Sequence, residues 1–569
     1  MNTIEGLQDK IHQLVPLIYV LSDDEHRAIV GINSLAKRKK FETEVYVYKS
    51  TTGIISFNEY VNDIDSKAYT SHKETVEPND AVIHVYKENK ENKKKIQVFI
   101  FTEADMLLDD NQIVRRLKDF VVQADNCDRN LKQIILLSSK LHLPDKIEKY
   151  LDVIVYPYPS DDEIKLIIED WVGKFNRMLK DDDCIEVRTD FEVVNSLKGL
   201  ITPQIYHAIS ACISTTRKQE RNKTINPLTN EPFKKRLDPV ILNNFKREMV
   251  NKTSMLKLRE PTISFKDVGG LGRLKTWLKK SYGGWTTEGK KFGLPLLKGV
   301  LLTGLPGCGK SRIAEALANE WQLNFVQFDP SSVFTSRVGE SEGNMRTVTA
   351  RLEALAPVIA FSDEIDKGLS GSHSSSFSDA GTTERTLGIY LTWLNDHRSS
   401  IFSVATCNKI ANLPPELISR FDEIFYIGPP NLEERKENIR IQIREEANRD
   451  PDKFNLDLLA RSSSNLSGRE IMQATKEAMY DAFHAGVDLN NDILAKALKK
   501  KIPIIKTMDK QLEDFVKWVG YDANTNDGVR ARFANNDGDE IDAMFKEVLE
   551  NADKKNEPNA YEYLTIDEK

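Results

Sequence analysis

Short apolar runs alternate with helical patterns along most of the chain, and this alternation predicts an α/β fold. Three such runs in the second half span residues 300–302, 358–361 and 401–406. Each is short enough to be a buried strand, and polar residues follow close behind each one. The pattern predicts a parallel sheet flanked by helices, with the chemistry collected at the carboxyl ends of its strands.

The first half of the chain repeats this pattern without the polar motifs. Strands are predicted at 14–20, 96–101 and 133–137, and a helix begins within 21–30. Ser22 and Glu25 have the spacing of a helix capping box, and the carboxylates at 23–25 place negative charge where a phosphate would have to sit. We predict that 1–175 is a copy of the second core that binds no nucleotide. An unrelated α/β domain is the alternative, since such alternation is common.

Residues 304–311 read Gly-Leu-Pro-Gly-Cys-Gly-Lys-Ser between a predicted strand and a predicted helix, which is a complete phosphate-binding P-loop. The glycines let successive N–H groups converge on anionic oxygens, and Lys310 reaches the β- and γ-phosphates. The Ser311 hydroxyl can ligate Mg²⁺. The predicted nucleotide-binding residues of this loop are Gly304, Leu305, Pro306, Gly307, Cys308, Gly309, Lys310, Ser311 and Arg312. The predicted cofactors are ATP and Mg²⁺.

Two further strand ends complete this chemistry. Asp363 and Glu364 follow the apolar run at 358–361, and we expect Asp363 to hold the Mg²⁺ shell and Glu364 to polarise the attacking water. Asn408 follows the run at 401–406 and is a candidate γ-phosphate sensor. The alternatives are a solvated acidic turn for the carboxylates and ordinary turn chemistry for the asparagine.

The order of the motifs resembles that of the AAA+ ATPases. The matching segments are 263–271, the P-loop, 338–342, 363–366, 405–408 and 413–422. More narrowly, 265–278 and the Arg-Phe-Asp-Glu-Ile-Phe sequence at 420–425 look like the cyanobacterial and plastid family called hypothetical chloroplast reading frame forty-six. The resemblance is strongest over about 260–505. It implies Mg²⁺-dependent ATP hydrolysis and a ring oligomer, for which a hexamer is one candidate form. It also implies nucleotide contacts from Asp267 and Gly269.

The resemblance also implies roles for two arginines. Arg420 would act as a finger on the ATP of a neighbouring subunit, and the alternative is a surface pair with Asp422 or Glu423. Arg469 coincides with the second-sensor arginine of other AAA+ branches, and the alternative is a helix-surface pair with nearby carboxylates. One position differs from the AAA+ unfoldases that thread a polypeptide through the pore of the ring. Arg337 stands where those proteins carry an aromatic side chain. Phe334 lies nearby, and we expect weak threading of polypeptide.

The domain boundaries follow from these patterns. We predict a degenerate AAA+-like α/β domain at 1–175, a helical lid and linker at 176–255 and a large ATPase subdomain at 256–430. A helical lid at 431–505 and an acidic C-terminal extension at 506–569 complete the chain.

Composition narrows the class of protein. The net charge of −7 disfavours a broadly cationic nucleic-acid binder, and five scattered cysteines indicate neither a disulfide framework nor a zinc site. No apolar stretch has the length of a membrane span, and the polar start is not a secretory signal. We expect a cytoplasmic protein, or one of the plastid stroma or a host cytoplasm.

Three functions are compatible with the sequence. The first is a ring ATPase that remodels or regulates an unidentified protein partner. The second is a slow ATP-dependent assembly switch or scaffold, which Arg337 favours. The third is a nucleic-acid motor or loader, which the acidic net charge disfavours.

Overall fold

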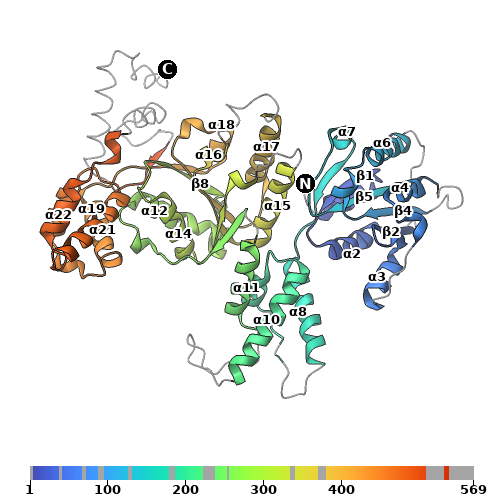
Figure 1. Cartoon of the computed structure of the whole chain (residues 1–569), viewed down its shortest axis with the longest axis horizontal. Coiled ribbons are helices and arrows are strands. Elements are labelled where there is room, and N and C mark those ends of the chain that lie inside the picture. Colours follow the sequence, from blue (N-terminus) through green and yellow to red (C-terminus); the bar gives the residue numbers. More distant parts are fainter. Residues whose placement is uncertain are drawn as a thin grey trace, which may run out of the picture. The chain divides into compact units, whose positions relative to one another are not determined.

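The structure is a computed structural model of the chain (Figure 1). It describes residues 4–37, 42–66, 72–87, 95–125, 131–177, 185, 187–221, 237–252, 255–333, 340–369, 380–507 and 531–536. Arg337 and Phe334 lie outside these ranges, so the prediction about threading stays a prediction. The chain divides into two compact units. The first comprises Met1–Ser254, Ser332–Leu355 and Gly381–Tyr390, and the second comprises Met255–Ser331, Ala356–Ala380 and Leu391–Lys569.

A six-stranded sheet forms the centre of the first unit, with the order β3-β2-β4-β5-β1-β6. Its strands are β1 (Leu17–Leu21), β2 (Thr43–Lys49), β3 (Gly53–Ser56), β4 (Ile96–Phe101), β5 (Lys132–Ser138) and β6 (Asp152–Val155). All neighbours pair in parallel except β2 and β3. Every residue of β1, β4 and β5 is buried, as expected for parallel strands covered on both faces.

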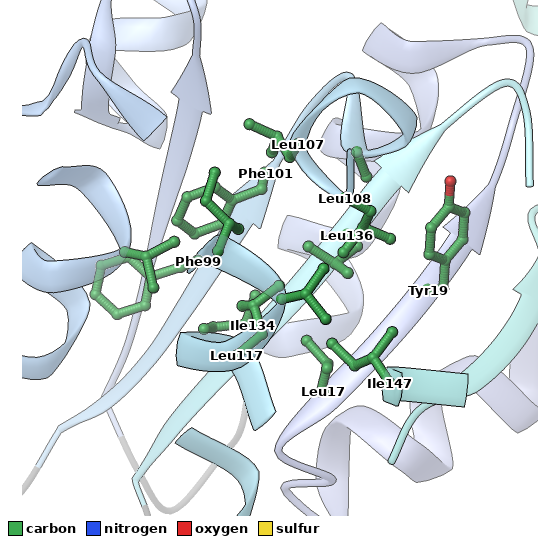
Figure 2. Close-up of a cluster of buried hydrophobic side chains, with 14 of the residues drawn as sticks. Leu17, Tyr19, Phe99, Phe101, Leu107, Leu108, Leu117, Ile134, Leu136 and Ile147 are labelled. Atoms are coloured by element: carbon green, nitrogen blue, oxygen red, sulfur yellow. The ribbon is translucent and has the colours of Figure 1, made fainter. Parts of the chain in front are cut away.

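Alternate residues of these strands supply two separate cores, because successive side chains of a strand point to opposite faces. Leu17 and Tyr19 join Phe99, Phe101 and Ile134 on one face, as Figure 2 shows. The intervening residues, such as Ile18 and Ile100, belong to the cluster on the other face. The helices around this sheet are α1 (Ile4–His12), α2 (Glu25–Ala36), α3 (Phe57–Ser66), α4 (Pro78–Lys87), α5 (Ala104–Leu107), α6 (Asn111–Asp125) and α7 (Asp145–Glu148).

The start of α2 corrects one prediction. Ser22 and Glu25 do not form a capping box, because the helix begins at Glu25 and its N-cap is Asp24. The Asp24 carboxylate accepts a hydrogen bond from the Arg27 backbone N–H. Ser22 lies two residues before the cap, and its hydroxyl accepts from the Asp24 N–H instead.

Four helices with their own apolar cluster follow the sheet: α8 (Asp161–Asn176), α9 (Phe191–Leu197), α10 (Thr202–Arg221) and α11 (Pro239–Asn251). Two segments that lie far along the sequence, inside the predicted 256–430 subdomain, group with the first unit. They contain α15 (Glu340–Leu355) and most of α17 (Ala380–Asp396). Arg385 of α17 pairs with Glu148 and with Glu342, and these ion pairs lie within the first unit.

The second unit has a seven-stranded sheet with the order β13-β12-β8-β11-β10-β9-β7. Its strands are β7 (Leu256–Arg259), β8 (Gly299–Gly304), β9 (Asn324–Phe328), β10 (Val358–Ser362), β11 (Ile401–Cys407), β12 (Glu423–Ile427) and β13 (Arg532–Phe533). Numbered along the chain from β8 to β12, the five central parallel strands lie in the order fifth, first, fourth, third, second. The five parallel strands of the first unit lie in the same order. The predicted fold class, a P-loop core with a second core of the same kind before it, is confirmed.

Helices cover this sheet and extend beyond it. Those around the sheet are α12 (Gly272–Ser281), α13 (Thr287–Phe292), α14 (Lys310–Glu320), α16 (Ile365–Leu369) and α18 (Pro415–Ile418). The lid consists of α19 (Leu432–Glu445), α20 (Leu456–Ser462), α21 (Gly468–His484) and α22 (Asn491–Lys500), which share one apolar cluster. Among the described residues, no helix is both long and apolar enough to cross a bilayer.

Candidate nucleotide-binding site

The P-loop lies where the sequence places it, between β8 and α14. Gly304 has a φ of 136° and Gly307 a φ of 82°, which side-chain-bearing residues rarely adopt. A Cβ on Gly304 would lie 2.2 Å from the Ile427 carbonyl oxygen, so the glycine also permits close approach of β12. The loop backbone therefore turns tightly enough to direct its N–H groups toward a phosphate.

Lys310 is held within the loop that it serves. Its Nζ donates to the carbonyl oxygens of Gly304 at 2.8 Å and Leu305 at 3.0 Å. Burial lowers the pKa of this ammonium group, while nearby anionic groups, including Asp363, oppose the shift. A bound phosphate would compensate the desolvated charge, because an anion next to a buried ammonium favours its charged form.

Three oxygen-bearing side chains meet at the strand ends. The Ser311 hydroxyl donates to the Asp363 carboxylate, with oxygen distances of 3.2 and 3.4 Å. Thr406, the penultimate residue of β11, donates to the same carboxylate at 2.5 Å. Mg²⁺ prefers carboxylate and hydroxyl oxygens, so Ser311 and Asp363 fit the ligand set predicted for it. β11 lies between β8 and β10, and its pairing with both brings these side chains together.

Glu364 lies on the same edge with both carboxylate oxygens engaged. Asn408 Nδ2 donates to Oε1 at 3.1 Å, and Lys367 Nζ lies 2.6 Å from Oε2. Lys367 and, to a lesser degree, Asn408 lower the pKa of Glu364, so it is ionised at neutral pH. The Thr406 hydroxyl accepts the Glu364 backbone N–H at 2.9 Å. The predicted base and sensor are therefore in direct contact.

Lys310, Ser311, Asp363, Glu364 and Asn408 line one cavity of about 410 Å³. The cavity is also bordered by the 267–271 loop and by the lid. The predicted residues along it are Asp267, Gly269, Pro306, Gly307, Cys308, Gly309, Lys310, Ser311, Arg312, Asp363, Glu364, Asn408 and Arg469. Gly304 and Leu305 contact Lys310 through their carbonyl groups but do not line the cavity.

Polar contacts join the rim of the cavity to the lid. Arg312 donates to the Asp267 carbonyl at 3.0 Å and pairs with Glu445 at 2.6 Å. Arg444 pairs with the Asp267 carboxylate at 2.8 Å. The Ser264 N–H, first of several donors, lowers the pKa of Asp267. Asp267 and Arg312 therefore tie the lid to the core, and a direct contact with nucleotide remains a prediction for both.

The two predicted arginines occupy different surroundings. Arg469 is the second residue of α21 and borders the cavity. Its backbone N–H donates to the Gly307 carbonyl at 3.1 Å. Arg420 does not line this cavity, and its Nη1 donates to the Asn395 carboxamide at 2.8 Å. The alternative pairs for Arg420 are otherwise engaged: Asp422 accepts from the Gly299 N–H, and Glu423 pairs with Arg532. An exposed Arg420 away from its own site is what a trans role requires.

The loop after β1, which corresponds to the P-loop by its place in the sheet, is engaged in contacts within the chain. The Asp24 carboxylate accepts the backbone N–H of Thr202 at 2.8 Å. Arg27 is paired with Glu163 and donates to the Pro157 carbonyl. The remaining cavity has a volume of about 20 Å³, which is room for about one water molecule.

Sequence reasoning missed two contributors to the second unit's site. Thr406 connects Asp363 and Glu364, and its place near the end of a strand, two residues before Asn408, was the available signal. Asn535 also borders the cavity. Its side chain accepts a hydrogen bond from the Gly428 N–H, although the two residues are 107 positions apart in the sequence. The prediction of 506–569 as an acidic extension gave no indication that 531–536 would join the sheet.

Comparison with known proteins agrees with this architecture. Residues 300–429 match the family model described as ATPase family associated with various cellular activities, and residues 3–156 match that of the SpoVK-like AAA ATPase N-terminal domain. An uncharacterized AAA domain-containing protein ycf46 of Trieres chinensis is 32% identical over 427 residues, covering 74% of this chain and 80% of the relative. Its counterpart in Pyropia yezoensis is 31% identical over 435 residues, covering 75% and 82%. The ATPase family gene 2 protein of Schizosaccharomyces pombe is 27% identical over 360 residues, covering 62% of this chain and 42% of the relative.

Proposed function

The chain belongs to the family of the ycf46 AAA domain-containing proteins, and from this premise we propose that it is an Mg²⁺-dependent ATP hydrolase. We propose further that it works as a ring oligomer that remodels or regulates a protein partner. The observation that carries the ATPase proposal is the meeting of Lys310, Asp363, Glu364 and Asn408 around one cavity. Lys310 comes from the P-loop, Asp363 and Glu364 follow β10, and Asn408 follows β11, as the sequence predicts.

The proposed reaction is transfer of the γ-phosphoryl group to water. Lys310 and the P-loop N–H groups bind and orient the phosphates, while Ser311 and Asp363 would hold Mg²⁺, which when bound would supply positive charge against the phosphate oxygens. Glu364 orients the attacking water and accepts its proton, and Asn408 holds the Glu364 carboxylate in place.

The contacts of Glu364 favour slow turnover of the isolated chain. Both of its carboxylate oxygens are engaged, one by Asn408 and one by Lys367. Each oxygen keeps a further acceptor site for a water, but Lys367 lowers the pKa of the carboxylate and so weakens it as a base. This supports the second candidate, an ATP-dependent assembly switch in which a partner or neighbour releases Glu364. Arg420 would then complete the site of the neighbouring subunit.

Two measurements test these proposals. Steady-state phosphate release should require Mg²⁺ and ATP and should disappear in Lys310→Ala. Loss of fluorescence from a degron-tagged folded reporter under excess ATP separates a threading motor from a switch. We expect measurable ATPase activity with little unfolding. Robust, processive unfolding by the wild-type protein would contradict the switch, and absence of nucleotide binding would contradict both proposals.

A further inference from the structure

A segment near the C-terminus forms part of the second unit's sheet and reaches its nucleotide cavity. β13 extends the sheet in parallel beside β12, with Arg532 opposite Phe425 and Phe533 opposite Tyr426. Phe533 is 4% exposed and packs edge-on against Tyr426, with ring centroids 5.5 Å apart. Ala534 is fully buried and belongs to the main apolar cluster of the unit. The segment is therefore docked in the core rather than laid on the surface.

The two residues that follow contact the connection between the large subdomain and the lid. This connection comprises residues 428–431, between β12 and α19. The Asn535 Oδ1 accepts the Gly428 N–H at 3.0 Å, and its Nδ2 donates to the Pro429 carbonyl at 3.3 Å. Asn431 Nδ2 donates to the Asn536 carbonyl at 3.3 Å. The segment thus fixes the place where the lid would hinge.

A buried carboxylate joins the segment to the opposite wall of the cavity. Glu434 is fully buried, and its Oε2 accepts from Asn535 Nδ2 at 2.8 Å. Its Oε1 accepts the N–H groups of Asn536 at 2.7 Å and Leu271 at 3.0 Å. Asn536 Oδ1 also accepts the Gly272 N–H at 2.7 Å. A buried charge needs such donors, so loss of the segment would leave Glu434 undersatisfied and release the 269–272 loop.

We infer that residues 531–536 are a positioning element of the nucleotide site, acting through Asn535 and Asn536. This inference rests on the proposed ATP binding by the same cavity. The segment orders the three walls that must converge on a nucleotide: the end of β12, the 269–272 loop and the start of the lid. Because linkage is reciprocal, nucleotide binding must in turn strengthen docking of the segment.

The double variant Asn535→Ala/Asn536→Ala tests the first half of this inference. Binding of a fluorescent ATP analogue should weaken at least about fivefold, within the usual range of coupling between sites. The effect should appear in KM more than in kcat, because neither residue contacts the groups placed at the reaction. Arg532→Ala is the matched control, since Arg532 lies in the same segment but pairs with Glu423 and does not border the cavity. We expect the control to bind as the wild type does.

The reciprocal half is tested on the wild-type chain, which removes any dependence on how well the variant folds. Hydrogen exchange of amides at 531–536 should slow on addition of ADP or a non-hydrolysable ATP analogue. It should be unchanged by the same ligands in Lys310→Ala. Unchanged affinity in the double variant, or unchanged exchange in a wild-type protein shown to be saturated with nucleotide, would overturn the inference. If the wild type binds no nucleotide, the proposed function itself fails.

Discussion

Replacing Glu364 by Gln should separate nucleotide binding from hydrolysis. The substitution keeps the side-chain volume and an Oε1 acceptor for Asn408, and the backbone bond to Thr406 does not involve the side chain. It removes the ion pair with Lys367, in which the side chains are 42% and 68% exposed. An exposed pair of this kind contributes about 0.2–1 kcal/mol to stability, so the fold and ATP affinity should change little.

The effect on turnover should be much larger. Loss of a positioned general base typically lowers a rate by about 10²–10⁴-fold. Such a decrease corresponds to about 2.7–5.4 kcal/mol of transition-state stabilisation. The expected increase in the activation free energy therefore exceeds the stability lost with the ion pair several-fold. This difference allows the two consequences of one substitution to be told apart.

The assay is single-turnover hydrolysis of Mg²⁺-ATP, with binding measured separately by a fluorescent analogue. Lys367→Met is the matched control, because it removes the same ion pair and leaves the carboxylate in place. It should keep turnover at or above the wild-type rate. The reasoning would be refuted if Glu364→Gln retained turnover within about threefold, well below the loss expected for a general base. An equal loss of rate in Lys367→Met would refute it as well.

Three other outcomes can be measured. Lys310→Ala should abolish ATP binding, and stoichiometric high-affinity binding by this variant in equilibrium titration would contradict a nucleotide-free first unit. Arg420→Ala should bind ATP and hydrolyse it poorly, and mixing with Lys310→Ala protein should restore activity; no recovery in shown co-assemblies would argue against a trans finger. Lys246 is buried in α11, where desolvation lowers its pKa from 10.5 to about 7, so the charged form destabilises the fold at and below pH 7 and this penalty vanishes toward pH 10.5. Lys246→Met should therefore stabilise the fold by about 2–4 kcal/mol at low pH, after subtracting about 1–3 kcal/mol for the Asn195 carbonyl that loses its donor, and should destabilise it above pH 10.5. The change is measured by hydrogen exchange of α11 amides, and a gain independent of pH would contradict the buried-charge explanation.

Local patterns were sufficient to predict the central part of the site. The P-loop requires glycines at positive φ next to a strand and a helix, and such requirements leave a direct mark on the sequence. Asp363, Glu364 and Asn408 were predictable for a related reason. Parallel strands of one sheet end on one edge, so polar residues just after neighbouring strands converge. The repeated strand order of the first unit was likewise visible as repeated spacing.

The same local reasoning gave the wrong cap for α2. Ser22 and Glu25 have the spacing of a capping box, but Asp24 caps the helix and also accepts the N–H of Thr202. The second contact comes from residues far along the chain. It favours Asp24 as the cap for a reason that a window of a few residues does not contain.

The sequence by itself determined which residues are the candidates to bind phosphate and metal, because those roles depend on residue type and on spacing within one strand, loop or helix. Tertiary structure alone decided which distant residues complete the site. Asn535 and Asn536 satisfy Glu434 and the N–H groups of Gly428 and Gly272. These bonds join residues separated by 101 to 264 positions. Buried polar groups must find partners, but which partner they find depends on how the whole chain folds.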